Sequence, residues 1–206
     1  MKKTMIAGSA VMLLGLAPVS YVLAQQVAST NPATVEAGTY QVEPYHTQIG
    51  FTLLHLGFSH FSGVFSQASG TLTIDPARPE AAKLEVSVPI QSVSTQVSKL
   101  DEELKGDQWF DAGQFPNATF SSTKVTPGGN GSATIAGNLT LHGVTRPVTL
   151  TAHFVGGGVN PLNKAYTIGF DATGTIKRSD FGVKTYVPLV GDEVTLTIAG
   201  AFEKQN

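Results

Sequence analysis

The chain has 206 residues, a formal net charge of −2 and no cysteine. Its length suits one domain with a full hydrophobic core, and its mildly acidic charge with scattered lysines gives no support for nucleic-acid binding. The lack of cysteine excludes disulfide bonds, thiol redox chemistry and thiolate metal sites. Stability must therefore come from burial and strand pairing.

Residues 1–24 have the layout of a cleaved export signal. Lys2 and Lys3 precede an apolar stretch, and Val22 and Ala24 occupy the positions three and one before the expected cleavage point. The apolar stretch is close to the ~20 residues that span a bilayer, so an uncleaved anchor is the alternative. We expect export and cleavage after Ala24.

Residues 25–38 lack hydrophobic periodicity, and we expect a flexible lead-in there. From residue 39 onward, apolar side chains alternate with Thr and Ser, which is typical of strands with one solvated face. Eight strands are predicted, at residues 46–56, 63–74, 82–93, 117–125, 132–142, 147–156, 165–177 and 193–203.

Eight long antiparallel strands favour an all-β, up-and-down barrel over residues 39–206, because closure removes the exposed edges. A β-sandwich is the alternative. One connection, residues 94–116, differs because Val97, Leu100 and Leu104 recur at helical spacing. Ser98, with Asp101 three residues later, favours a helix cap. The sequence thus predicts a barrel with a short helical cap.

In a simple meander, alternate connections lie at the same end of the barrel. One end would then hold ordinary turns, at residues 75–79, 126–131 and 156–164. The other end would hold connections rich in aromatic, His and Arg residues, at residues 57–61, 94–116, 142–147 and 177–193. A turn does not require such residues, so we expect the mouth of the barrel at this second end.

Four longer stretches carry a family resemblance. They are FTLLHLGFSHFSGVFSQASGTLTID (51–75), SKLDEELKGDQWFDAGQFPNATFSS (98–122), IAGNLTLHGVTRPVTL (135–150) and IKRSDFGVK (176–184). In fixed order over residues 39–204, they resemble the YceI-like family of periplasmic, lipocalin-like proteins. The chain departs from that family at Leu54, Glu103 and Trp109, where a basic residue, His and Phe are usual. These changes bear on the ligand more than on the fold.

The resemblance implies a barrel with a long apolar cavity for a polyisoprenoid, or for a quinone-like or fatty-acyl molecule. It also implies the periplasm of a bacterium with an outer membrane. The resemblance is also compatible with transient contact with a membrane or with a b-type cytochrome. It leaves open whether the protein forms a homodimer. No residue here points to any of these partners.

Pattern alone cannot decide whether the inward-facing side chains are ordinary core or a cavity lining, since a barrel of about eight strands can be packed or hollow. The resemblance favours a lining. The residues expected to contact the ligand are Phe51, Leu53, His55, Phe65, Leu104, Trp109, Phe110, Phe120, Leu139, Leu141, Phe170, Arg178 and Phe181. Arg178 could clamp a head group or instead pair with Asp101 or Asp180.

An enzyme is the less favoured alternative. The sequence has no G-x-S-x-G elbow, H-E-x-x-H zinc helix or P-loop, and its five His lack a metal-ligand spacing, so no catalytic residue, metal or cofactor is assigned. A lipid hydrolase or isomerase using His55 and Asp101 as an acid–base pair stays open, as does a barrel without a cavity. We expect a binding or carrier protein.

Overall fold

The structure, a computed structural model, describes residues 27–205, so the expected signal at residues 1–24 lies outside it. The strands are β1 Gly38–Val42, β2 Gln48–His55, β3 Ser59–Phe65, β4 Ser69–Ile74, β5 Lys83–Pro89, β6 Asn117–Pro127, β7 Ser132–Leu141, β8 Val144–Val159, β9 Tyr166–Lys177 and β10 Glu193–Lys204. The helical elements are η1 Pro32–Thr34, η2 Pro79–Ala81, η3 Ile90–Ser92, α1 Ser98–Lys105 and η4 Arg178–Phe181.

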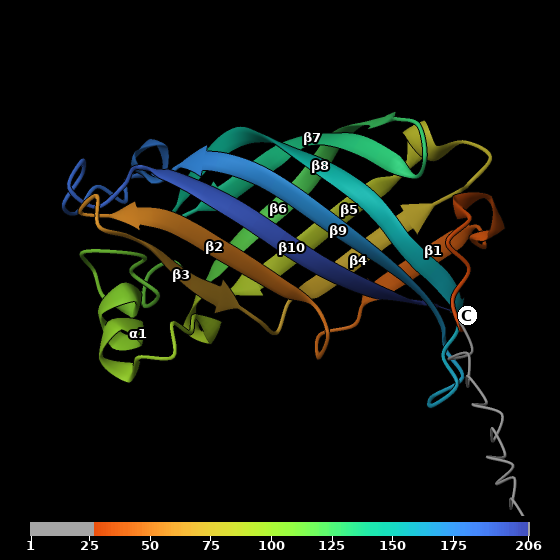
Figure 1. Cartoon of the computed structure of the whole chain (residues 1–206), viewed down its shortest axis with the longest axis horizontal. Helices are drawn as coiled ribbons and strands as arrows, with labels where there is room; N and C mark the ends of the chain where they lie inside the picture. Colours follow the sequence, from red (N-terminus) through yellow and green to blue (C-terminus); the bar gives the residue numbers. More distant parts are fainter. Residues whose placement is uncertain (1–26, 206) are drawn as a thin grey trace, which may run out of the picture.

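Eight of these strands close into an antiparallel barrel (Figure 1). The strand order is β1-β4-β5-β6-β7-β8-β9-β10, and β10 pairs back with β1. In that closing pair, Tyr40 is opposite Lys204, and Val42 is opposite Phe202. The predicted eight-stranded antiparallel barrel with one short helix is therefore confirmed.

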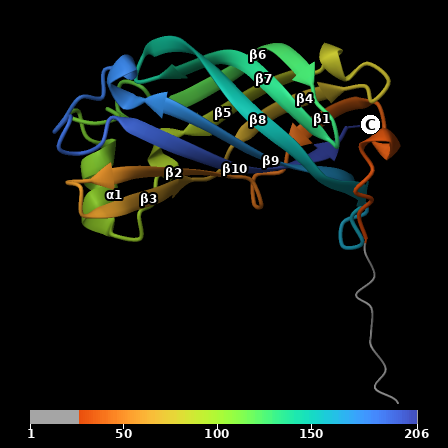
Figure 2. The same cartoon turned by 45° about the horizontal axis from the view of Figure 1, so that its top comes forward.

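The β2–β3 hairpin lies outside the closed ring, which the sequence analysis did not foresee. β2 pairs with the first half of β10 and β3 pairs with β2, so the hairpin extends the sheet beyond the barrel near α1 (Figure 2). The single strand predicted at 63–74 is wrong, because Gln67 has φ +58 and turns the chain between β3 and β4. Strand β1 was not predicted, because five residues are too few to show a clear alternation of apolar and polar side chains.

Helix α1 lies where the helical spacing predicted it, and Leu104 is its buried residue. The expected cap at Ser98 is wrong, because Val97 is the N-cap residue and no side chain caps the helix. Asp101 reaches back instead, and its carboxylate accepts the Thr95 hydroxyl at 2.7 Å and the Thr95 backbone N–H at 2.6 Å. These two bonds lower the pKa of the Asp101 carboxyl and fix the chain where it enters the helix.

The two ends of the barrel differ in construction. One, here called the turn end, carries the β4–β5, β6–β7 and β8–β9 connections together with η1 and the C-terminus (Figure 1). The other, the helix end, carries α1 and the long loop that contains η4. Packed side chains close the helix end, where Ile90, Phe181 and Val183 are each 1% exposed. They form a plug across the barrel.

Arg178 holds this plug together. Its side chain is 4% exposed, and the guanidinium donates to the carbonyl oxygens of Val183 at 3.0 Å, Val190 at 2.7 Å and Gly191 at 2.8 Å. Its central carbon also lies 5.3 Å from the centroid of the Trp109 ring. Burial lowers the pKa of the Arg178 guanidinium, but carbonyl dipoles and an aromatic face satisfy the charge.

Asp192 fastens the other side of the same loop. Its carboxylate accepts the Ser179 backbone N–H at 2.9 Å and the Ser179 hydroxyl at 2.8 Å. Burial alone would raise the pKa of the Asp192 carboxyl, but the Ser179 bonds and the nearby Arg178 charge lower it below its usual value. The ionised form of Asp192 therefore stabilises the plug.

We expect Gly70→Ala to destabilise the barrel. Gly70 has φ +141, and a Cβ at this position would overlap the carbonyl oxygen of Glu85 on the neighbouring strand β5. Backbone strain and a disturbed ladder should lower the free energy of unfolding by about 3 kcal/mol, measured by urea denaturation. The control is Gly129→Ala, where a Cβ meets no atom within 4 Å. Equal losses in both variants would contradict the expectation.

We expect Asp192→Asn to weaken the plug in a pH-dependent way. Because the folded pKa of Asp192 is lowered, its stabilisation is complete above the unfolded pKa of about 3.9 and is lost as pH falls through the lower folded value. Urea unfolding, followed by the fluorescence of Trp109, the only Trp, should show the variant less stable at neutral pH and equal to wild type in acid. A difference in the free energy of unfolding between the variant and wild type that stays constant from neutral to acidic pH would contradict this role of the ionised Asp192 carboxylate.

Candidate functional site

The barrel encloses a cavity of about 460 Å³, a volume within the range of small-molecule sites. All eight barrel strands contribute to its wall. Within residues 27–205, no lining residue carries a charged side chain, and the polar ones are Thr47, Thr119 and Ser132. The Thr47 hydroxyl already accepts the Ala201 backbone N–H at 3.0 Å. The wall therefore offers a ligand apolar contact and little else.

Small residues in the wall keep the barrel hollow. Ala152 on β8 lies directly opposite Ala172 on β9, and both line the cavity. Larger side chains at these positions would fill a barrel of eight strands. Ile135, Leu139 and Ile198 also point inward, yet they are only partly buried, because they face the space that the alanines leave.

The cavity reaches solvent at the turn end. Pro32 of η1, Pro127 of β6 and Gly128 line it while being exposed, and Pro76 and Pro79 complete the rim of this opening. The mouth expected at the helix end is therefore wrong, since the plug closes that end. The connections at 75–79 and 126–131, interpreted as ordinary turns, border the opening instead.

One side of the opening is formed by residues 27–35, here called the N-terminal strap. Ser29 and Gly157 exchange two backbone hydrogen bonds of 2.9 Å each, and the Tyr166 hydroxyl donates to the Thr34 carbonyl at 3.0 Å. A Cβ on Gly156 would lie 3.0 Å from that of Ala28, so the glycines let the strap lie directly on β8. Residues 156–159, expected in a turn, belong to β8.

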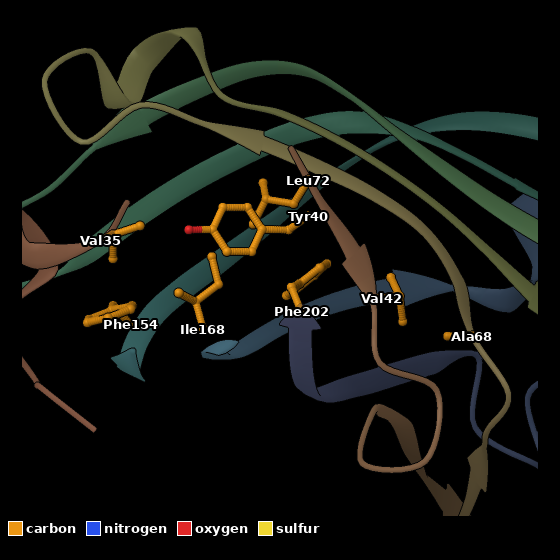
Figure 3. Close-up of a cluster of buried hydrophobic side chains, with 8 residues drawn as sticks. All are labelled: Val35, Tyr40, Val42, Ala68, Leu72, Phe154, Ile168 and Phe202. Carbon is orange, nitrogen blue, oxygen red and sulfur yellow. The ribbon is translucent and has the colours of Figure 1, made fainter. Parts of the chain in front are cut away.

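An apolar cluster supports the strap and forms the adjoining wall. Figure 3 shows its buried members, which are Val35, Tyr40, Val42, Ala68, Leu72, Phe154, Ile168 and Phe202. The Tyr40 hydroxyl points toward Val35 in this view and donates to the Glu36 carbonyl at 2.6 Å. Burial raises the pKa of Tyr40 to about 12, so the hydroxyl keeps its proton and the bond persists.

The structure separates the expected ligand-binding residues into two groups. Those that line the cavity are Phe65, Phe120, Leu139, Leu141 and Phe170. Those that lie at the helix end, outside the lining, are Phe51, Leu53, His55, Leu104, Trp109, Phe110, Arg178 and Phe181. Phe51 and Leu53 were expected in the lining of the cavity and the others near its mouth, but most of the eight pack into the closed helix end of the barrel.

The polar members of the second group have structural surroundings. The guanidinium of Arg178 bonds to carbonyl groups rather than to Asp101 or Asp180. His55 is exposed, and its ring centroid lies 6.4 Å from that of Phe61. Among the described residues no hydrogen bond or ion pair joins His55 to Asp101, whose carboxylate is bonded to Thr95. The geometry gives no support to that acid–base pair.

Residues 27–205 lack two further features. This part of the chain contains no group of three or more His, Asp or Glu side chains that could hold a metal ion. None of its helices is long and apolar enough to cross a membrane.

Sequence reasoning missed the residues that make the cavity possible. They are the small lining residues Ala118, Ala133, Ala152, Ala172 and Gly200, and the rim prolines Pro32, Pro76, Pro79 and Pro127. The small residues could have indicated a hollow barrel from the sequence. They occupy inward-facing positions in strands of alternating pattern, where bulky residues would otherwise fill the barrel. The prolines carried none, since turns use proline for reasons unrelated to a ligand.

Solved structures of other proteins share this fold. The crystal structure of BcnA from Burkholderia cenocepacia superposes with a TM-score of 0.70 at 25% identity, covering 78% of this chain and 98% of BcnA. A polyisoprenoid-binding domain from Saccharophagus degradans, implicated in plant cell wall breakdown, superposes with a TM-score of 0.60. It is 14% identical and covers 82% of this chain and 100% of that domain, a likeness that shows the fold alone.

Comparison of sequences identifies the family. A UPF0312 protein of Shewanella oneidensis is 40% identical over 155 residues, which span 74% of this chain and 81% of that protein. Residues 40–202 match the YceI-like domain, so the resemblance inferred from the four stretches is confirmed. The chain therefore belongs to the YceI-like domain family.

Proposed function

We propose that this protein binds a polyisoprenoid or another long-chain amphiphile in the barrel cavity and carries it through the periplasm. The observation that carries the proposal is the cavity itself, which is apolar, uncharged along its described wall and open at the turn end. The polyisoprenoid-binding domain of Saccharophagus degradans, which shares the fold, supports the same ligand class. Location in the periplasm is supported by the signal-like sequence of residues 1–24.

Apolar burial supplies enough free energy to retain such a ligand. Each buried methylene contributes about 0.8 kcal/mol, so a chain of a few isoprene units gains roughly 12 kcal/mol gross. Association and ordering cost about 4 to 15 kcal/mol. At the lower end of that cost about 8 kcal/mol remains, which corresponds to micromolar binding without a strong contact to a head group.

The polar end of the ligand remains at the opening. An ionised head group inside the cavity would lose its hydration without gaining an oppositely charged partner, which costs several kcal/mol. The rim borders solvent at Pro32, Pro127 and Gly128, so a head group placed there stays hydrated. The tail therefore points toward the plug.

Mass spectrometry of the protein purified from its natural host tests the proposal directly. The intact complex, measured under native conditions, should carry a discrete extra mass. Organic extraction should release a molecule with an isoprenoid or acyl fragmentation ladder. A protein that is free of lipid, and that stays so after incubation with geranylgeraniol, would rule out this function.

We expect Ala172→Phe to block the cavity without unfolding the barrel. Ala172 lines the cavity opposite Ala152, so a phenyl ring there would take the place of several buried methylenes of a ligand. Retention of geranylgeraniol in native mass spectrometry should fall by about tenfold or more, the equivalent of about 1.4 kcal/mol. The matched control is Thr173→Phe, because Thr173 is the next residue of β9 and is exposed. If both variants keep the circular-dichroism spectrum of a β protein and retain geranylgeraniol equally, the ligand binds outside this cavity.

A further inference from the structure

The inner end of the cavity is a closed floor. Ile90 enters the barrel on η3, directly after β5 ends at Pro89, and is 1% exposed. Phe65, the last residue of β3, lies beside it in the lining. Its ring centroid is 5.6 Å from that of Phe51 and 5.6 Å from that of Phe110.

Hydrogen bonds hold this floor in place. The Ile90 backbone N–H donates to the Pro116 carbonyl at 2.9 Å. The Ser92 hydroxyl donates to the Pro89 carbonyl at 2.6 Å and accepts the Ser66 N–H, next to Phe65, at 3.1 Å. The backbone of Ile90 and of the residue after Phe65 is thus tied to neighbouring segments, and these bonds fix the backbone that carries the floor.

Phe65 also separates two apolar regions. It packs against the cluster of the β2–β3 hairpin and α1, and against the cluster around Ile90. Phe51, Phe61 and Trp109 belong to the first region but do not line the cavity. The Phe65 ring is therefore the partition between the cavity and a further apolar region on its far side.

We propose that Phe65 and Ile90 act as a stop that sets the length of the lipid tail. This inference rests on the proposed function and adds a determinant of specificity to it. A tail that enters from the turn end gains apolar burial with each carbon until its terminus meets the stop. Further carbons remain in water at the opening and add little affinity.

Binding of farnesol, geranylgeraniol and solanesol to the same protein tests the stop. In Phe65→Ala the loss of the partition should let a longer tail enter. The retention of solanesol relative to geranylgeraniol in native mass spectrometry should then rise at least tenfold over wild type. The matched control is Phe61→Ala, which removes the same ring from the same strand and apolar cluster but not from the cavity wall. Its ratio should equal that of wild type.

A second variant moves the stop in the opposite direction and opens no new space in the core. Ala118 lines the cavity opposite Val88, close to Ile90. Ala118→Leu should therefore weaken geranylgeraniol at least tenfold while farnesol binding stays within about twofold. If Phe65→Ala does not fold, Ala118→Leu alone still tests the stop.

The outcomes distinguish the two proposals. Prenol binding with the same length preference in wild type, Phe65→Ala and Ala118→Leu would overturn the stop and leave the carrier function intact. A change of the same size in Phe61→Ala and Phe65→Ala would also overturn the stop, because the cluster as a whole would then set the length. Failure of wild type to bind any of the three prenols would overturn the carrier function itself.

Discussion

The cavity exists because a short pairing between β1 and β10 closes the ring. The first half of β10 is paired with β2, and Phe202, Glu203 and Lys204 at its other end pair with β1. Since the β2–β3 hairpin leaves the ring at this point, β1 alone can join β10 to β4. Tyr40 lies at the centre of that join and is fully buried, and its hydroxyl donates to the carbonyl of Glu36, the residue that follows the strap. Closure here leaves the turn end as the route to the interior.

Charge and apolar surface are separated along the barrel. The wall of the cavity holds no charged residue in the described chain, whereas the plug contains a buried cation, Arg178. Three carbonyl groups and the Trp109 ring satisfy that cation, so it needs no anionic ligand. Aromatic and basic residues gathered at one end of a barrel can therefore indicate a closure as well as a mouth.

The sequence predicted the barrel, the helix near residue 98 and the family, because strand alternation and the four stretches extend over most of the chain. It could not predict which end is open. That depends on the volume left where Ala152 faces Ala172 and on the way Ile90 turns inward after Pro89, and neither produces a periodic pattern. Sequence also left Arg178 open between a ligand head group and an acidic partner, because a residue type does not reveal whether its partners are carboxylates, backbone carbonyls or a bound molecule.

Both ends of the described chain lie at the open end of the barrel. Val27 begins the strap that crosses β8 beside the opening. The C-terminus, marked in Figure 1, lies at the same end, just beyond the pair of Lys204 with Tyr40. An affinity tag or surface tether attached at either terminus would therefore crowd the route by which a molecule reaches the interior. Loops at the helix end, such as the one carrying the 88% exposed side chain of Phe58, give attachment points that leave this route clear.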